Sequence, residues 1–270
     1  MGWKGIKNVL PSKGSSLWSS KSKSLRTRND DGEKQPKEYY GNSHAGSEAG
    51  TPSPIDAELN KLFDSLRSNV DPVDSLGVDS TSAYLVEKLG VNIENAEPFI
   101  VMEIVQAPAI GSITRKGFVD GWKNQNGVST IHEQASRVKA LSSTLAHDRS
   151  LFKRVYRHTF LAAKEQDQKA ISLEYALIYW ETLFTNPGLA WSSSGHDWLS
   201  LWKEYLTANW TRSINKDMWN QTLEFAYKTL EDGSLSFWSE DGAWPSVIDD
   251  FVSWCRESKG IKAEQMDMDA

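Results

Sequence analysis

Apolar residues recur at intervals of three and four along most of the chain, which is the spacing of amphipathic helices. The first such run opens with Ser53, a suitable N-cap, and Pro54, which suits the first helical position. Similar runs, separated by short breaks rich in Gly, Pro, Asn and Asp, predict helices at residues 55–68, 80–90, 95–106, 115–125, 131–144, 148–165, 172–185, 196–210, 216–231 and 246–258. Alternating strand patterns and solenoid repeats are essentially absent, so the predicted fold class is all-α.

Residues 1–52 have a different composition, rich in Ser, Lys, Gly and Asn with few aliphatic side chains. Such a stretch cannot bury enough apolar surface to offset its ordering entropy, and we predict a disordered basic and polar tail. The ordered domain is expected at residues 53–258, followed by a flexible C-terminal tail at 259–270. Nine of the twelve tryptophans lie at or beyond Trp180, which predicts a Trp-rich helical C-terminal half with a large aromatic core, in preference to a ligand cage.

The charge is unevenly distributed. Residues 1–28 contain seven Lys and Arg and no acid, and because the chain carries −6 overall, −6 less +7 leaves −13 for the remainder. An acidic body argues against nucleic acid as the main partner and favours a basic protein. The basic head is interpreted as a solvated tail, with a membrane surface, nucleic acid or an import receptor as alternatives.

Compartment and membrane association follow from two further features. No apolar run approaches the roughly 18 residues of a transmembrane helix, so we expect no stable membrane insertion. A single cysteine, Cys255, cannot form an internal disulfide, which favours the nucleus and cytoplasm as the location.

The first two predicted helix pairs have the outline of EF-hands. Each loop contains a glycine followed by an aliphatic residue, Val78 in one and Ile113 in the other, and we expect these two to meet in a short β-bridge. A calcium loop that started at Asp71 would need carboxylates where Val73 and Ser75 stand. The N-terminal half is therefore predicted to be EF-hand-like without calcium, and a calcium-responsive protein is a rival interpretation from another class.

Motifs of enzyme chemistry are missing from the sequence. It contains no HExxH pair, GxSxG elbow, GxGxxG or Walker loop, and we predict no catalytic residue, metal or cofactor. The letters SGHD at 194–197 are interpreted as a turn that leads into a helix. Cys255 is interpreted as a structural thiol on an amphipathic helix, with a thiol ligase as the alternative.

Two carboxylates stand near predicted helix starts. Asp217 lies in the first turn of one helix, and Asp249 lies near the start of another, for which Pro245 suits the first position. They either compensate helix dipoles on a wet surface or flank a small apolar floor, Ala243, to form a pocket for Lys or Arg. The spacing leaves both interpretations open.

Four segments carry a resemblance to a known family. Residues 214–220 read INKDMWN, 242–252 read GAWPSVIDDFV, 173–180 read LEYALIYW and 118–121 read FVDG. In order and spacing they resemble the defective-in-cullin-neddylation family, whose domain is called potentiating-neddylation, or PONY. The similarity covers residues 55–256 and implies an all-α domain whose N-terminal half is EF-hand-like and binds no metal.

The resemblance implies a scaffold-type ligase that is not itself an enzyme. Such an adaptor holds the C-terminal winged-helix region of a cullin beside the neddylation conjugating enzyme and orients modifier transfer to a cullin lysine. No covalent intermediate forms on it, so catalysis is positional. The cullin-bound RING subunit is a further candidate partner. The family's cullin-binding acid–alanine–acid patch falls on Asp217, Ala243 and Asp249, and the loop between the first two looks about two residues longer than usual.

The resemblance implies a second site, an apolar cleft for the acetylated N-terminal Met of the conjugating enzyme. Its aligned positions are Val78, Val101, Val105, Ile113, Ile171 and Tyr179, all of which also suit an ordinary core. Pro98, Ala162 and Thr182 stand where larger apolar residues are common, which indicates a reshaped cleft or weaker dependence on acetylation. A rival interpretation is an adaptor that binds a cullin without productive recruitment of the conjugating enzyme. The segment before Pro54 lacks the pattern of a ubiquitin-associated domain, so ubiquitin binding is not expected.

Overall fold

The computed structural model describes residues 53–261 except 166 and 194, and the predicted N-terminal tail lies outside these residues. The described part is mainly helical, with α2 (Pro54–Leu66), α3 (Val78–Ala83), the π-helix η1 (Tyr84–Lys88), α4 (Glu97–Ile104), α5 (Arg115–Lys123), α6 (Ile131–Thr144), α7 (Arg149–Ala163), α8 (Leu173–Leu183), α9 (Trp198–Asn209), α10 (Lys216–Glu231) and α11 (Ser246–Lys259). The all-α class is confirmed, and every predicted helix is present. The segment predicted at 80–90 is shared by α3 and η1. Within the described ranges, no helix is long and apolar enough to cross a bilayer.

Three pairs of two-residue strands join the loops between these helices. They are β1 (Ser75–Leu76) with β2 (Ile113–Thr114), β3 (Ala170–Ile171) with β6 (Ile214–Asn215), and β4 (Ser192–Ser193) with β5 (His196–Asp197), all antiparallel. The expected partner of Ile113 was Val78, and this was wrong: Ile113 pairs with Leu76, which is fully buried. Val78 instead begins α3, so its backbone is already helical and cannot extend the ladder.

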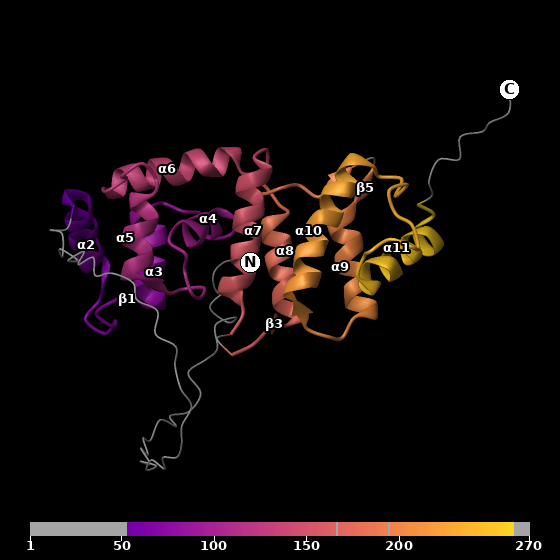
Figure 1. The fold of residues 1–270 in the computed structure, drawn as a ribbon, viewed down its shortest axis with the longest axis horizontal. Helices are drawn as coiled ribbons and strands as arrows, with labels where there is room; N and C mark the ends of the chain where they lie inside the picture. Colours follow the sequence, from indigo (N-terminus) through magenta and orange to yellow (C-terminus); the bar gives the residue numbers. More distant parts are fainter. Residues whose placement is uncertain (1–52, 166, 194, 262–270) are drawn as a thin grey trace, which may run out of the picture.

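The helices form an elongated row (Figure 1). Helices α2 to α6 occupy one end, α7 stands in the middle, and α8 to α11 form the other end. Helix α4 packs against α6 and α7, while α7 also packs against α8 and α10. Helix α7 therefore packs against helices of both ends.

The first loop of the N-terminal half uses its carboxylate internally. Asp71 accepts hydrogen bonds from the backbone N–H groups of Ser68 (2.9 Å) and Gly77 (3.0 Å) and from the hydroxyl of Ser80 (2.5 Å). Desolvation raises the pKa of this carboxyl, but the bonds from Ser80, Ser68 and Gly77 outweigh it and leave the pKa below its usual value. Both carboxylate oxygens of Asp71 therefore accept hydrogen bonds from the protein itself.

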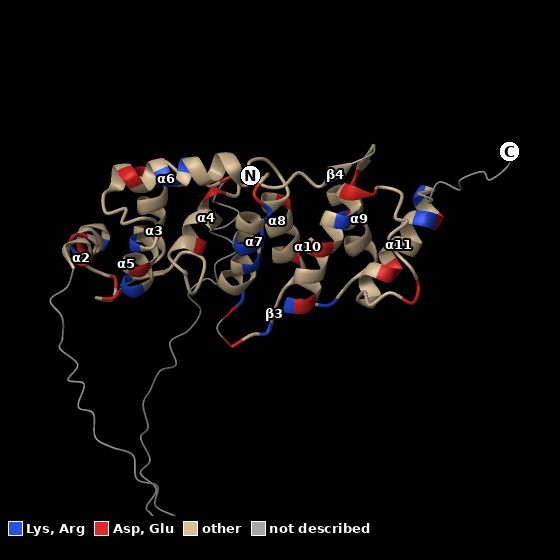
Figure 2. Ribbon diagram, turned by 45° about the horizontal axis from the view of Figure 1, so that its top comes forward, with Lys and Arg blue, Asp and Glu red and all other residues tan. Residues whose placement is uncertain are grey.

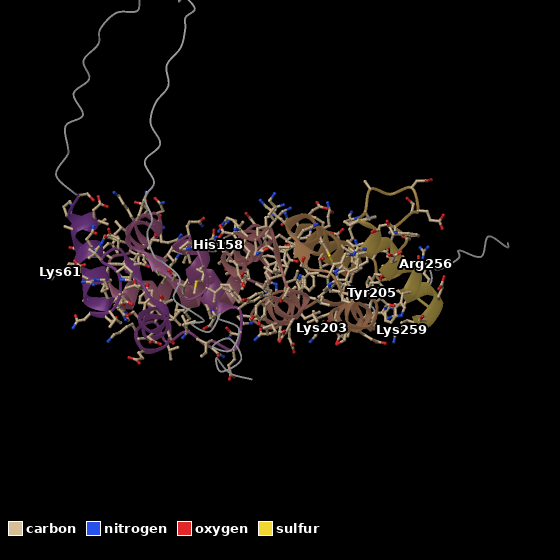
Figure 3. The ribbon with its side chains drawn as sticks, turned by 90° about the horizontal axis from the view of Figure 1, so that it is seen from below. Lys61, His158, Lys203, Tyr205, Arg256 and Lys259 are labelled. Atoms are coloured by element: carbon tan, nitrogen blue, oxygen red, sulfur yellow. The ribbon has the colours of Figure 1, made fainter. Side chains whose placement is uncertain are left out.

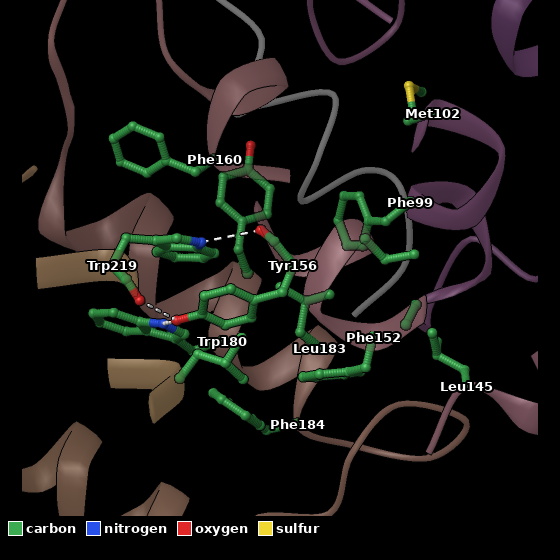
Figure 4. Packing of buried hydrophobic residues seen from close by; sticks show 14 of the residues in the cluster. Phe99, Met102, Leu145, Phe152, Tyr156, Phe160, Trp180, Leu183, Phe184 and Trp219 are labelled. Atoms are coloured by element: carbon green, nitrogen blue, oxygen red, sulfur yellow. Dashed lines mark hydrogen bonds between the residues drawn. The ribbon is translucent and has the colours of Figure 1, made fainter. Parts of the chain in front are cut away.

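An aromatic stack fills the interface between α7, α8 and α10 (Figure 4). Tyr156 stacks on Trp219 with ring centroids 4.6 Å apart, and Trp219 stacks on Trp180 at 5.1 Å. The Tyr156 hydroxyl accepts a bond from Trp180 Nε1 (2.7 Å) and donates to the Trp219 carbonyl (2.8 Å), while Trp219 Nε1 donates to the Tyr156 carbonyl (3.0 Å). The predicted aromatic core of the C-terminal half is present, and in this part of it the Tyr156 hydroxyl and the indole N–H groups of Trp180 and Trp219 are all paired.

The stack continues into the last helices. Trp202 of α9 meets Trp180 edge-on at 5.8 Å and Phe251 of α11 at 5.0 Å. Helix α11 runs to Lys259 and ends at Gly260, whose φ of +70° forms a left-handed cap, and Ile261 beyond it is buried. Residues 259–261, assigned above to the C-terminal tail, therefore pack as part of the domain.

Replacement of Tyr156 by Phe tests the stack. The variant keeps the ring but leaves Trp180 Nε1 and the Trp219 carbonyl without their partner, so we expect the free energy of unfolding to fall by about 1–3 kcal/mol. Urea denaturation of the full chain measures this loss. The matched control is Tyr175→Phe, because the hydroxyl of half-buried Tyr175 bonds to no described residue. Equal stability of the two variants would contradict the assignment.

Candidate functional site

Asp217 is positioned by a strand pair and a cap. Strand β6 pairs Ile214 with Ile171, and the next residue, Asn215, caps α10 by accepting a 2.8 Å bond from the Met218 N–H. Asp217 lies in the first turn of this helix and is exposed. Trp219, two residues later, is fully buried in the stack. Because positions two apart point to opposite sides of a helix, burial of Trp219 turns Asp217 to solvent.

Ala243 lies in the loop between α10 and α11, which is fixed at several points. Asp232 accepts bonds from the backbone and hydroxyl groups of Ser234 and Ser236, which together hold the pKa of its carboxyl well below the usual range. Trp244 packs edge-on against Phe225 at 5.8 Å. Ala243, just before this anchored ring, is exposed.

Asp249 lies in the first turn of α11 and is half-buried. Pro245 is the N-cap of this helix, one position before the first helical residue at which the sequence placed it. The Asp249 Oδ1 accepts a 2.9 Å hydrogen bond from the indole N–H of Trp238. Phe251, two residues later, packs on Trp202, so α11 repeats the arrangement of α10: a carboxylate two residues before a buried aromatic ring.

The starts of α10 and α11 lie along the same lower edge of the molecule in Figure 2. The carboxylates of these two helix starts and of the loop before α11 are here called the acidic edge: Asp217, Glu240, Asp241, Asp249 and Asp250. Both predicted aspartates lie in the first turns of helices that start along this edge, each at the positive end of a helix dipole.

The acidic edge makes no internal ion pair. Among the described residues, no Lys or Arg nitrogen lies within 4.0 Å of any of its five carboxylates. Three basic side chains at this end, labelled in Figure 3, are engaged elsewhere: Lys203 bonds to Glu181, Lys259 bonds to Glu204, and Arg256 lies over the Trp238 ring. Since the carboxylates are not neutralised from within, the edge is suited to a basic partner.

The six predicted cleft positions are dispersed over five elements and are mostly interior. Val101 and Val105 belong to the end of α4, Ile113 to β2, Ile171 to β3 and Tyr179 to α8, and all five are at most 3% exposed. Val78, at the start of α3, is 37% exposed and is the member that reaches the surface. The structure thus gives five of the six a core environment and leaves one accessible.

Contacts of the predicted cleft residues show which of them meet. Ile113 pairs with Leu76, and the backbone at Gly111 approaches Val78 so closely that a Cβ on Gly111 would lie 3.4 Å from the valine Cγ2. Tyr179 lies edge-on to Phe99 of α4 at 5.8 Å. Of the divergent positions, Pro98 and Ala162 are buried, and the Thr182 hydroxyl donates to the Ile178 carbonyl.

The remaining candidates for chemistry are structural. Cys255 is fully buried, and desolvation raises the pKa of its thiol to about 12, so the reactive thiolate is scarce at neutral pH. His196 and Asp197 form β5 of a tight hairpin, and Asp197 caps α9 by accepting a 3.0 Å bond from the Ser200 N–H. This agrees with the predicted turn into a helix.

Sequence reasoning missed Trp238. This residue is 8% exposed and donates to Asp249 from a loop position eleven residues earlier. A single tryptophan in a loop has no periodic pattern, and a spacing of eleven residues across a turn does not indicate a contact. The one sequence feature that could have pointed to Trp238 is its position in the long loop beside the GAWP segment.

Comparison with known proteins identifies the family of the chain. The sequence profile of a family described as Cullin binding matches residues 133–254, which include Asp217, Ala243 and Asp249. Defective in cullin neddylation protein 1 of Pyricularia oryzae is 44% identical over 232 residues, covering 82% of each chain. The protein of the same name from Yarrowia lipolytica is 31% identical over 197 residues, covering 73% of this chain and 77% of the relative.

A more distant relative comes from animals. The human DCN1-like protein 5 is 31% identical over 168 residues, which cover 62% of this chain and 66% of that protein. The match to the Pyricularia protein extends well beyond the segment that the Cullin binding profile covers. Together with the all-helical fold, these similarities show that the chain belongs to the defective in cullin neddylation family.

Proposed function

We propose that this protein promotes cullin neddylation by binding the C-terminal winged-helix region of a cullin through Asp217, Ala243 and Asp249. The observation that carries the proposal is the acidic edge, whose carboxylates lack an internal ion pair among the described residues. Family membership and the match to the Cullin binding profile over this region support it.

The proposed binding mode follows from the geometry of the two aspartates. Each lies in the first turn of a helix, two residues before an aromatic ring that packs in the core. This packing fixes the helix starts and thereby the positions of the carboxylates. A Lys or Arg side chain of the cullin would pair with them, while the small side chain of Ala243 leaves room for its aliphatic stem. Binding would therefore be electrostatic and oriented.

The proposed mechanism is positional. An adaptor that holds the cullin and the charged conjugating enzyme together raises the effective molarity of the acceptor lysine and restricts its orientation. Such a mechanism needs no nucleophile on the adaptor. The burial of Cys255 and the raised pKa of its thiol support this over a thiol ligase.

The second proposed site would receive the acetylated N-terminal Met of the conjugating enzyme. Exposed Val78 would be the point of entry, whereas Val105 and Ile113 of the same set are fully buried. Because these two are fully buried, entry of the Met side chain requires neighbouring side chains to move. The same burial, together with Ala162 and the hydrogen-bonded Thr182, favours the second candidate function, a cullin-binding adaptor without productive recruitment of the conjugating enzyme.

Replacement of Asp249 by Ala tests the docking residues. Truncating one partner of a largely desolvated charge pair costs about 2–5 kcal/mol, which is roughly a 30-fold or larger rise in Kd. Calorimetric titration of the full chain with a cullin C-terminal fragment measures it, with circular dichroism to verify folding. Asp79→Ala is the matched control, since Asp79 is an exposed first-turn aspartate of α3 at the other end of the molecule. Equal binding by wild type and Asp249→Ala would contradict the proposal.

Replacement of Val78 by Arg tests the cleft. A guanidinium at this position disfavours burial of a Met side chain, so an N-acetylated peptide from the conjugating enzyme should bind more weakly, as fluorescence anisotropy would show. The control is Val70→Arg, because Val70 is 92% exposed in the loop between α2 and β1. If the wild type binds the cullin but not the peptide, the second candidate function is the better one. Equal peptide binding by wild type and Val78→Arg would remove Val78 from the site.

Replacement of Cys255 by Ala tests the positional mechanism. Alanine adds no polar atom to the buried site, and we expect the folded variant to stimulate modifier transfer to the cullin as the wild type does. Single-turnover transfer assays with a charged conjugating enzyme measure this. Loss of stimulation in a variant that still binds the cullin would revive the thiol-ligase alternative.

A further inference from the structure

Trp238 contacts α11 at two places two turns apart. Its indole N–H donates to Asp249 Oδ1 at 2.9 Å, and its ring lies under the guanidinium of Arg256, whose carbon is 4.6 Å from the ring centroid. Asp249 and Arg256 are seven residues apart, so both project from the same face of the helix. The tryptophan side chain therefore contacts both Asp249 and Arg256 on that face, with its donor at the Asp249 end.

The loop holds Trp238 from the other side. The Arg256 guanidinium also donates to the carbonyl of Leu235, which is fully buried and has a φ of +61°. The Trp238 backbone N–H donates to the same carbonyl at 3.3 Å. With its ring 8% exposed and its backbone tied to Leu235, Trp238 has little freedom to leave Asp249.

The nature of the donor matters for the charge of Asp249. An indole N–H is a neutral donor and cannot accept a proton or form an ion pair, so the bond orients the carboxylate without neutralising it. Arg256 is directed to the ring and to the Leu235 carbonyl, and it lies beyond ion-pair distance of Asp249. One oxygen, Oδ1, is thus used for orientation, and Oδ2 makes no hydrogen bond to a described residue.

We propose that Trp238 is a positioning residue of the docking site: it fixes the Asp249 carboxylate through Oδ1 so that Oδ2 is presented to a basic side chain of the cullin. This inference rests on the proposed function. Its physical basis is preorganisation, because a carboxylate already held in its binding orientation loses less conformational entropy when the partner arrives. Trp238 acts through Asp249 and needs no contact of its own with the cullin.

The test compares Trp238→Phe with wild type in cullin-fragment titrations of the full chain. Phenylalanine keeps an aromatic ring under Arg256 and removes the N–H, and we expect Kd to rise roughly three- to tenfold, as for one side chain that must be ordered on binding. The matched control is Trp254→Phe on α11, because its indole N–H bonds to no described residue and its ring stacks with Phe251. The control should bind as the wild type does.

A double-mutant cycle separates positioning from a general effect on the loop. In the Asp249→Ala background, Trp238→Phe should cause no further loss of affinity, since there is no carboxylate left to orient. If the two losses instead multiply, Trp238 contributes independently of Asp249 and the inference is overturned. If Asp249→Ala weakens binding but Trp238→Phe does not, the inference fails while the docking site stands. If Asp249→Ala has no effect, the docking site is itself wrong and the inference fails with it.

The indole N–H resonance of Trp238 in an NMR spectrum of the ¹⁵N-labelled protein reports the bond without a cullin. We expect it to shift in Asp249→Ala and to keep its position in Asp250→Ala, a neighbouring exposed aspartate that makes no bond to Trp238. The same spectra show whether each variant is folded. An unmoved Trp238 resonance in Asp249→Ala would overturn the inference whatever the binding data show.

Discussion

The reciprocal contact between Tyr156 and Trp219 is the interaction on which the C-terminal half depends. The two rings stack, and each residue also satisfies a polar atom of the other, with Trp180 completing the set. Because the Tyr156 hydroxyl and the indole N–H groups of Trp180 and Trp219 all find partners within this set of three, the arrangement has little freedom to shift. It fixes the start of α10 relative to α7, and through Trp202 and Phe251 it extends to α11.

That packing explains how a largely aromatic core supports an acidic surface. Asp217 precedes buried Trp219 by two residues, and Asp249 precedes buried Phe251 by two residues. On each helix the inward aromatic ring sets the rotation, and the rotation turns the carboxylate outward. The proposed positional mechanism requires contact residues on rigid elements of the fold, and the first turns of two packed helices are rigid.

The two proposed sites differ in how accessible their residues are to a partner in this structure. The aspartates on the acidic edge are in place, and one of them is already oriented by Trp238. At the cleft positions Val78 is at the surface, whereas residues such as Val105 and Ile113 are fully buried and form part of the core. The first proposed site would bind with little rearrangement. The second would require side chains to move, so the proposed binding of the conjugating enzyme would depend on how readily the N-terminal half rearranges.

The sequence by itself determined the all-α class and the position of every helix, because the 3.6-residue apolar period, the cap at Ser53 and the Gly breaks are local signals. It also brought Asp217, Ala243 and Asp249 forward through the resemblance of their flanking motifs. The tertiary structure decided the register of Leu76 with Ile113, the burial of most cleft positions and the bond from Trp238 to Asp249. Two-residue strands are too short to show alternation, and an apolar residue has the same sequence signal in a core as in a cleft. A hydrogen bond across a long loop depends on where the chain returns, which only the packed fold determines.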